Sequence, residues 1–321
     1  INTGNGNFKR DINSLPQVQS SGSIVTASDY DKDGDIDLFI GGRVVPGEYP
    51  YAPNSYLLIN EGGIFKNQTE ETSPELEKIG MVTSAQWVDI NKDNKIDLIV
   101  TGEWMGIEIF INKNNKLIKS KEYATLRNSI GWWNKIVLED IDNDGDKDII
   151  AGNLGLNYKF HASTEKPFHI YTTDFDFNGT EDIVLAKNYN GREVPVRGKG
   201  CMTQQLPHLA RKIPSYTDFA NKDVKGIVGK RIESALHYRA TEFRSGIFIN
   251  NGSNDFSFEP FANVAQQSPI NSIVYQDFDK DGLKDLILAG NNYMSEVETT
   301  KSDAGVGTYL KGATNGSFKY I

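Results

Sequence analysis

Short apolar runs recur along the chain, and each follows an acidic stretch. The clearest is Leu38-Phe39-Ile40-Gly41-Gly42, and similar runs open at Leu98, Ile149, Ile183 and Leu286. Apolar runs of this length that end near glycine are typical of strands buried on both faces, and they are too short for most helices. The pattern therefore predicts an all-β chain made of repeated units.

The first unit shows four strands in order. Residues 24–29 lead into the acidic stretch, residues 36–42 leave it, residues 55–60 form a third strand, and a fourth begins at residue 64 after a Glu-Gly-Gly turn. The second and last units repeat this order. Four antiparallel strands per unit, with a period of tens of residues, are typical of β-propeller blades. We predict a propeller with five full blades and part of a sixth, and expect about seven in a complete ring.

The domain organisation expected from this pattern is a single propeller domain over residues 1–321. Residues 1–12 are similar to the end of a blade, so we expect them to finish a preceding one, in a chain that is part of a longer protein. Residues 188–244 are predicted to be an inserted, partly helical segment, and residues 247–252 a third strand. Because residues 153–169 leave little room for two strands, the third blade is expected to be irregular.

The acidic stretches share one spacing of oxygen side chains. Five copies, named loops 1 to 5, start at Asp29, Asp89, Asp140, Asp174 and Asp277, with Asp or Asn at positions 1, 3, 5 and 9. Calcium takes six to eight oxygen ligands from a loop that curls around it. Position 6, where the chain must turn sharply, is glycine in four loops and asparagine in loop 2, and both residue types tolerate a positive φ.

The spacing predicts up to five Ca²⁺ sites. The expected ligands, with position 7 giving its backbone carbonyl, are Asp29, Asp31, Asp33, Asp35 and Asp37; Asp89, Asn91, Asp93, Lys95 and Asp97; Asp140, Asp142, Asp144, Asp146 and Asp148; Asp174, Asp176, Asn178, Thr180 and Asp182; and Asp277, Asp279, Asp281, Leu283 and Asp285. Loops 2 and 4, which have an amide in place of one carboxylate, are expected to bind more weakly.

Two other interpretations of the acidic loops are less favoured. An EF-hand needs a bidentate glutamate at position 12 and flanking helices. Position 12 is apolar in all five loops: Ile40, Val100, Ala151, Leu185 and Leu288. Solvated acidic turns would account for a single copy, but five copies in the same phase favour metal loops.

Composition and charge argue against a nucleic-acid-binding protein and against a transmembrane chain. The net charge is −9, with 43 acidic and 34 basic residues, and the acidic loops account for the whole of this excess. We find no basic or aromatic-basic motif for nucleic acid and no apolar run of the length of a transmembrane segment. Cys201 is the only cysteine, which excludes an intrachain disulfide.

The loops resemble FG-GAP/VCBS repeats, the calcium-binding blades of integrin α-chains and of many bacterial surface proteins. Residues 41–47, 131–134, 152–157 and 204–207 are also similar to segments of large Bacteroidota proteins of the ASPIC/UnbV group, related to cartilage acidic protein. This resemblance implies export to the cell surface, on the outer face of the outer membrane, often as a lipoprotein near glycan-import systems.

The topology also indicates where a ligand would bind. Because each acidic loop joins the first two strands of its blade, all five loops should share one face, and the long connecting segments should lie on the opposite face. The candidate ligand-binding residues there are Arg43, Tyr49, Trp104, Trp132, Trp133, Asn153, Asn157, Arg197, Asn291 and Tyr293. Tryptophans at strand ends often pack instead, so a structural role for Trp132 and Trp133 stands beside the binding role.

The favoured function is a non-catalytic, calcium-stabilised binding module at the cell surface. It would present the face opposite the calcium loops to a glycan or protein partner, and could serve an outer-membrane nutrient importer. The alternative is a polysaccharide lyase or hydrolase that uses His, Tyr or Arg side chains on that face. No nucleophile–base motif identifies catalytic residues, so none is assigned.

Overall fold

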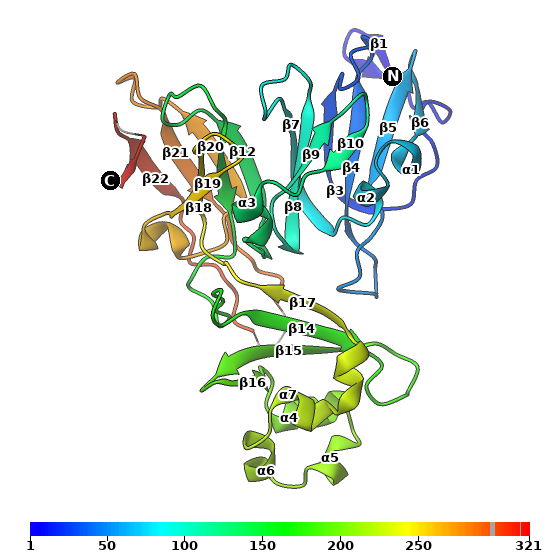
Figure 1. Cartoon of the computed structure of the whole chain (residues 1–321), viewed down its shortest axis with the longest axis vertical. Coiled ribbons are helices and arrows are strands. Elements are labelled where there is room, and N and C mark those ends of the chain that lie inside the picture. Colours follow the sequence, from blue (N-terminus) through cyan, green and yellow to red (C-terminus); the bar gives the residue numbers. More distant parts are fainter. Residues whose placement is uncertain (296–298, 315) are drawn as a thin grey trace.

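The computed structural model describes residues 1–295, 299–314 and 316–321. In these residues the chain is mostly β, and its strands form several four-stranded antiparallel sheets. We number a sheet by the acidic loop that joins two of its strands. Figure 1 shows sheets 1, 2, 3 and 5 side by side in an open arc, with sheet 4 and its helices beneath them.

Sheets 1, 2 and 5 are meanders of consecutive strands. Sheet 1 contains β3 (Ser21–Ser28), β4 (Asp37–Val44), β5 (Tyr56–Glu61) and β6 (Ile64–Asn67). Sheet 2 contains β7 (Met81–Val88), β8 (Asp97–Met105), β9 (Glu108–Asn112) and β10 (Leu117–Lys119), and β11 (Gly131–Trp132) also pairs with the end of β8. Sheet 5 contains β20 (Ser272–Gln276), β21 (Asp285–Ala289), β22 (Thr308–Gly312) and β23 (Phe318–Tyr320).

Sheet 3 has the same four-stranded order, but its chain is interrupted. It contains β12 (Lys135–Glu139), β13 (Asp148–Gly152), β18 (Gly246–Asn250) and β19 (Phe256–Pro260). The third strand expected over residues 247–252 is therefore present. It belongs to sheet 3, the sheet of loop 3. The third blade was expected to be irregular, but sheet 3 has four regular strands, because its third and fourth strands come later in the chain, after a long insertion.

The insertion spans residues 153–245 and includes a complete sheet, so it is longer than the predicted segment 188–244. Sheet 4 is ordered β16 (Arg192–Pro195), β15 (Asp182–Tyr189), β14 (Phe168–Thr173) and β17 (Leu236–Ala240). Its last strand returns beside its first, which is a Greek-key order and not a meander. The fourth acidic loop thus belongs to an inserted unit and not to a fifth member of the arc.

Helices lie mainly in the insertion, between β16 and β17. They are α4 (Lys199–Gln205), α5 (Leu209–Lys212), α6 (Tyr216–Ala220), α7 (Val224–Val228) and the 3₁₀ helix η1 (Lys230–Ser234). Ser215 and Asp223 cap α6 and α7, since each side chain accepts a backbone N–H of the first turn. Short helices elsewhere are α1 (Thr69–Thr72), α2 (Pro74–Glu77), α3 (Ala124–Asn128) and η2 (Asn263–Gln266).

The amino-terminal residues form a separate hairpin. Strands β1 (Asn2–Gly4) and β2 (Asn7–Phe8) pair only with each other among the described strands. The predicted blade end over residues 1–12 is therefore a two-stranded ribbon in this structure, and Phe8 is 79% exposed on it.

Both faces of the arc's internal sheets are buried, which explains the unbroken apolar runs. In β8, Leu98 and Val100 join the core cluster that contains Phe39 of sheet 1, while Ile99 joins the cluster that contains Ile149 of sheet 3. Alternate side chains of one strand thus pack against the two neighbouring sheets. Sheets 3 and 5 share a third cluster built in the same way.

Sheet 4 is also covered on both faces. One face packs on the helices through Val184 and Ala186, and the other packs on the strand ends of the arc through Phe168 and Ile170. The inserted unit docks on the side of the arc remote from loops 1, 2, 3 and 5, as Figure 1 shows. It carries loop 4, whose Glu181 accepts a hydrogen bond from Tyr51 of the β4–β5 connection, so the prediction that all five loops share one face is wrong. The insertion therefore occupies much of the face on which the sequence predicted a ligand.

Candidate metal centres

Each acidic loop turns at position 6, as the sequence predicted. The φ angle there is 96° at Gly34, 90° at Gly145, 86° at Gly179 and 92° at Gly282, and it is 62° at Asn94. In every loop the N–H of this residue donates to the Oδ2 atom of the position 1 aspartate, at 2.8–3.2 Å. The positive φ is what turns this N–H back towards the start of the loop.

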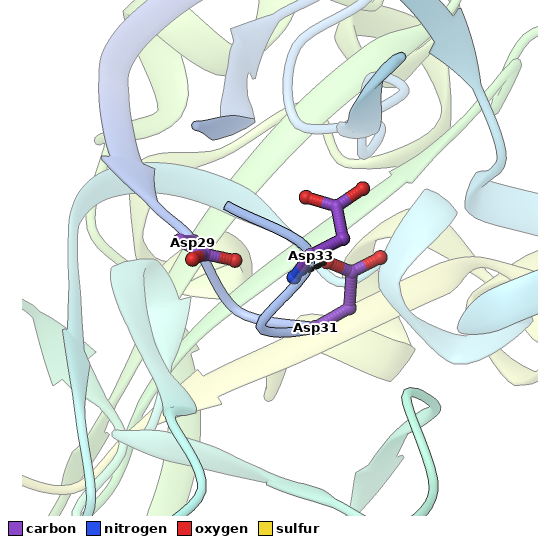
Figure 2. Close-up of side chains that lie close together, drawn as sticks. All are labelled: Asp29, Asp31 and Asp33. Carbon is purple, nitrogen blue, oxygen red and sulfur yellow. Dashed lines mark hydrogen bonds between the residues drawn. The ribbon is translucent and has the colours of Figure 1, made fainter. Parts of the chain in front are cut away.

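A ladder of side chain to backbone hydrogen bonds orders the rest of the loop. In loop 1 the Asp33 N–H donates to Asp31 Oδ1 at 3.3 Å, and the Asp35 N–H donates to Asp33 Oδ1 at 2.8 Å. The other four loops repeat both contacts. Figure 2 shows Asp29, Asp31 and Asp33 gathered on the curve of loop 1.

Several carboxylate oxygens are left available for a cation. Asp29, Asp140 and Asp277 each bury an Oδ1 atom that accepts no hydrogen bond from the part of the chain that the structure describes. Loops 1, 3, 4 and 5 each bring three aspartates close enough for one ligand atom of each to lie within 4.8 Å of the others. A buried oxygen without a donor is costly unless a cation binds it, so the donor set fits calcium, which prefers oxygen ligands.

The position 9 aspartate has a second role that the sequence did not reveal. In sheet 3, Asp148 is fully buried, and its Oδ2 accepts the N–H of Ile141 while its Oδ1 accepts the N–H of Asn250, both at 2.8 Å. One carboxylate thus ties the acidic loop to the third strand. We call this pair of hydrogen bonds the clamp.

The clamp recurs throughout the arc. The third-strand donors to Asp37, Asp97 and Asp285 are the backbone N–H groups of Asn60, Asn112 and Gly312, at 2.7–2.9 Å. In sheet 4 the third strand is not used. The Gln205 side chain of α4 donates to Asp182 at 3.4 Å instead, so a helix replaces a strand in the inserted unit.

Burial makes the ionised clamp costly without a cation. Desolvation raises the pKa of Asp37 and of Asp97 to about 6, and it raises the pKa of Asp148 and Asp182 as well. Asp285 differs because its hydrogen bonds, including one from the Tyr309 hydroxyl at 2.9 Å, outweigh burial and lower its pKa. The apo loops therefore hold desolvated carboxylates that a divalent cation would stabilise.

Position 4 of each loop is a feature that sequence reasoning missed. It has φ between 58° and 64° in all five loops, although none of these residues is glycine. In loops 1 and 2 the side chain at this position reaches the acidic loop of the next sheet. Lys32 reaches the Asn94 carbonyl in loop 2, and Lys92 pairs with Asp146 in loop 3, so neighbouring loops are linked.

Three of the predicted ligand-binding residues are buried in the protein. Trp133 is fully buried and donates through Nε1 to the Ser129 carbonyl at 2.8 Å, and Trp104 is 5% exposed. Asn153 is also fully buried, where its Oδ1 accepts the Trp132 N–H at 3.1 Å. Trp104 packs against Phe168 of the insertion, Trp133 packs in the core shared by sheets 2 and 3, and Asn153 bonds to the returning end of the insertion, so all three have a structural role.

Arg43 and Tyr49 lie in a polar chain beside the docked insertion, and Trp132 packs against this chain. Trp104 Nε1 donates to the Tyr49 hydroxyl at 2.6 Å, and the Tyr49 hydroxyl donates to Glu103, which also pairs with Arg43. Trp132 packs edge-on against Trp104, with ring centroids 5.1 Å apart. The polar groups of Arg43, Tyr49 and Trp104 are paired within the chain, whereas Trp132 Nε1 is buried and donates to no acceptor among the described residues.

The remaining predicted residues are more accessible. Asn157 is exposed, and Tyr293 is 57% exposed with its hydroxyl 3.0 Å from the Asn291 amide nitrogen. Asn291 also accepts the Gly305 N–H at 2.8 Å, and Arg197 is half-buried after β16. Because these side chains are accessible, ligand binding on the side of the molecule where they lie stays a proposal.

A cluster of ionisable side chains on sheet 4 was not predicted. His169 Nδ1 lies 2.9 Å from His237 Nε2, and Tyr171 stacks on His237 at 4.3 Å between ring centroids. Glu193 Oε2 is 3.8 Å from His169 Nε2. Burial lowers the pKa of both histidines, and the nearby Arg239 guanidinium lowers it further. The residues are distant in sequence, so only strand pairing brings them together.

Comparison with known protein families identifies an FG-GAP-like repeat at residues 89–151. The matched segment begins at the first residue of loop 2 and ends within β13, so it includes two acidic loops. Comparison with curated proteins gives no match. The FG-GAP resemblance is thus supported over this segment, whereas the narrower resemblance to the ASPIC/UnbV group has no support.

One finding bears on the membrane. No helix in the described ranges is long and apolar enough to span a bilayer.

The clamp can be separated from metal binding by comparing two aspartates of loop 3. Asp148→Ala removes both clamp hydrogen bonds and leaves two buried N–H groups unpaired, which should cost about 2–5 kcal/mol even in excess chelator. Asp142→Ala, at position 3, should have little effect in chelator and should destabilise only when calcium is present. Urea unfolding with and without chelator measures both. Equal losses for the two variants in chelator would contradict a separate clamp.

The histidine pair predicts an acid-sensitive inserted unit. Because the folded pKa of His169 and His237 lies below the ordinary value of 6.5, the stability they contribute is complete above that pH and is lost as pH falls through the folded pKa. The midpoint of thermal unfolding should therefore drop more steeply between pH 7 and pH 5 in the wild type than in His237→Gln. Parallel pH profiles for the two proteins would refute this.

Proposed function

We propose that the protein is a calcium-stabilised binding module of the FG-GAP type. The observation that carries the proposal is the convergence of several carboxylates in the acidic loops, where the buried Oδ1 atoms of Asp29, Asp140 and Asp277 accept no hydrogen bond from the described residues. Calcium would supply positive charge to those oxygens, and each bound ion would stabilise the folded chain by mass action. The arc of sheets would then be part of a β-propeller.

The loops would have a structural function in this proposal. The position 9 carboxylate touches both the loop and the third strand, so an ion bound there would brace three strands of one sheet. The lysine links between loops 1, 2 and 3 would transmit this order along the arc. None of this requires chemistry at the metal, and the ion would act as a cross-link.

The partner surface would lie away from the calcium loops. There, Asn157, Asn291 and Tyr293 are the predicted ligand residues that remain accessible, and tyrosine and asparagine suit both glycan and protein partners. We propose a glycan or protein partner at the cell surface, which the FG-GAP-like repeat favours. An accessory role beside an outer-membrane nutrient importer and a lipoprotein anchor belong to the same proposal.

A second candidate function rests on the cluster of sheet 4. His169, His237, Tyr171 and Glu193 form a contact network of groups that can donate or accept protons, and burial shifts the pKa of both histidines and raises that of Tyr171. Such a group could perform general acid–base catalysis on a polysaccharide. The binding module remains the preferred function because no activated nucleophile accompanies the cluster in the described part of the chain.

Removal of calcium should destabilise the protein strongly. A site saturated at 100 times its dissociation constant contributes about 2.7 kcal/mol, so several sites together should lower the midpoint of thermal unfolding by more than about 10 °C in excess chelator. Differential scanning calorimetry with calcium, with chelator and with calcium restored measures the effect. An unchanged midpoint would refute calcium stabilisation.

Binding and catalysis can be separated on one panel of soluble polysaccharides. We expect affinity electrophoresis to show retardation by at least one polysaccharide without new reducing ends or unsaturated products. Tyr293→Ala should weaken that retardation about tenfold, as expected for loss of a central aromatic contact, whereas Tyr216→Ala, which removes a 72% exposed tyrosine of α6, should not. Turnover that Tyr171→Phe or His237→Gln abolishes in a folded protein would favour the enzyme.

A further inference from the structure

Loop 5 differs from loops 1, 2 and 3 at one residue of its third strand. In each of these sheets, the residue that follows the position 9 aspartate pairs with a residue of the third strand. The residue that comes directly after that partner in the third strand occupies an equivalent position in each sheet. It is Ile59 in sheet 1, Ile111 in sheet 2 and Ile249 in sheet 3. In sheet 5 it is Lys311.

The position explains why a lysine is tolerated there. Ile59 and Ile111 are 5% and 8% exposed because the next sheet of the arc covers them. No described sheet covers the corresponding face of sheet 5, where Val274 and Ile287 are 45% and 37% exposed. A charged side chain on β22 can therefore stay partly in water, and the Lys311 side chain is 33% exposed.

Lys311 does not point away from the protein. Its ammonium pairs with Asp279 Oδ2 and lies 2.9 Å from Asp281 Oδ2. These are the position 3 and position 5 carboxylates of loop 5, two of its expected calcium ligands. Among the described residues, no lysine or arginine pairs with the equivalent Asp31 and Asp33 of loop 1, so this contact distinguishes loop 5.

We propose that Lys311 is a tethered cation that competes with calcium for loop 5 and makes loop 5 a more readily exchanged site than loops 1 and 3. This inference rests on the proposed calcium function and adds a difference in calcium affinity between loop 5 and loops 1 and 3. The ammonium holds the two carboxylates together when calcium is absent, and it must be displaced when calcium binds. Loop 5 then stays folded in both states.

The proposal changes the order of affinities that the sequence predicts. With four aspartates, loop 5 should rank with loops 1 and 3, above loops 2 and 4, each of which has one asparagine ligand. The ammonium of Lys311 offsets one carboxylate charge, so the local charge of loop 5 matches that of the weaker pair. Because a lysine salt bridge must also be broken, loop 5 should release calcium before loops 1 and 3.

The test uses the full chain and calcium alone. Lys311→Ile installs the residue found in sheets 1, 2 and 3, and Lys311→Met removes the charge while keeping a flexible side chain. Lys284→Met is the matched control, because Lys284 also lies in loop 5 but pairs at 3.1 Å with Glu139, which is not an expected ligand. Asp279→Asn identifies which binding step in a calorimetric calcium titration belongs to loop 5.

Two effects of opposite sign are expected for both Lys311 variants. Calcium affinity at the loop 5 step should rise about tenfold, the size expected for removing one charge beside the ion near a protein surface. In excess chelator the same variants should unfold at a lower temperature than the wild type, because Asp279 and Asp281 then repel each other unopposed. If Lys311 only packed on the sheet, its replacement would not both raise calcium affinity and lower the unfolding temperature in chelator.

The remaining outcomes overturn the proposal in distinguishable ways. If the loop 5 step stays in place in Lys311→Ile, or moves equally in Lys284→Met, Lys311 does not compete with calcium. If Asp279→Asn weakens no binding step of the titration, loop 5 is not a calcium site and only this inference fails. If the wild type shows no calcium binding at all, the proposed function fails with it.

Discussion

The fold depends on a buried carboxylate in each of sheets 1 to 5. The aspartate at position 9 accepts one N–H from its own loop and one from a different element, as Asp148 does with Ile141 and Asn250. A hydrogen bond to a charged group is stronger than one between neutral groups, and leaving its partners unpaired in the core is costly. The same residue is an expected calcium ligand, so strand pairing and metal binding are coupled through a single side chain.

This coupling explains how the chain accepts a long insertion within a sheet. The third strand of sheet 3 arrives after residues 153–245, yet Asn250 still donates to Asp148 as if no residues intervened. Loop closure entropy grows slowly with length, so a long excursion is tolerated when the strand ends are held by specific contacts. In sheet 4, where the chain order changes, Gln205 of a helix takes over the donor role.

The two sides of the arc differ in structure and in proposed role. Loops 1, 2, 3 and 5 lie on one side, where lysines connect loops 1, 2 and 3. The insertion, which carries loop 4, docks on the other side through an aromatic cluster around Phe168 and Trp104. Residues that the sequence predicted to bind a ligand, such as Trp133, serve this docking or the core beneath it. A partner surface would therefore be shaped by the inserted unit as well as by the arc.

The sequence by itself determined the local features, because they depend on neighbours along the chain. The ligand spacing from Asp29 onwards, the positive φ at Gly34 and the short buried strands all follow from side-chain chemistry and backbone sterics over about ten residues. Only the tertiary structure decided which strands share a sheet, that loop 4 belongs to an insertion, and that Lys311 reaches Asp281. Those facts depend on pairing between distant segments, and nearly identical apolar strands leave that pairing open until the chain is packed.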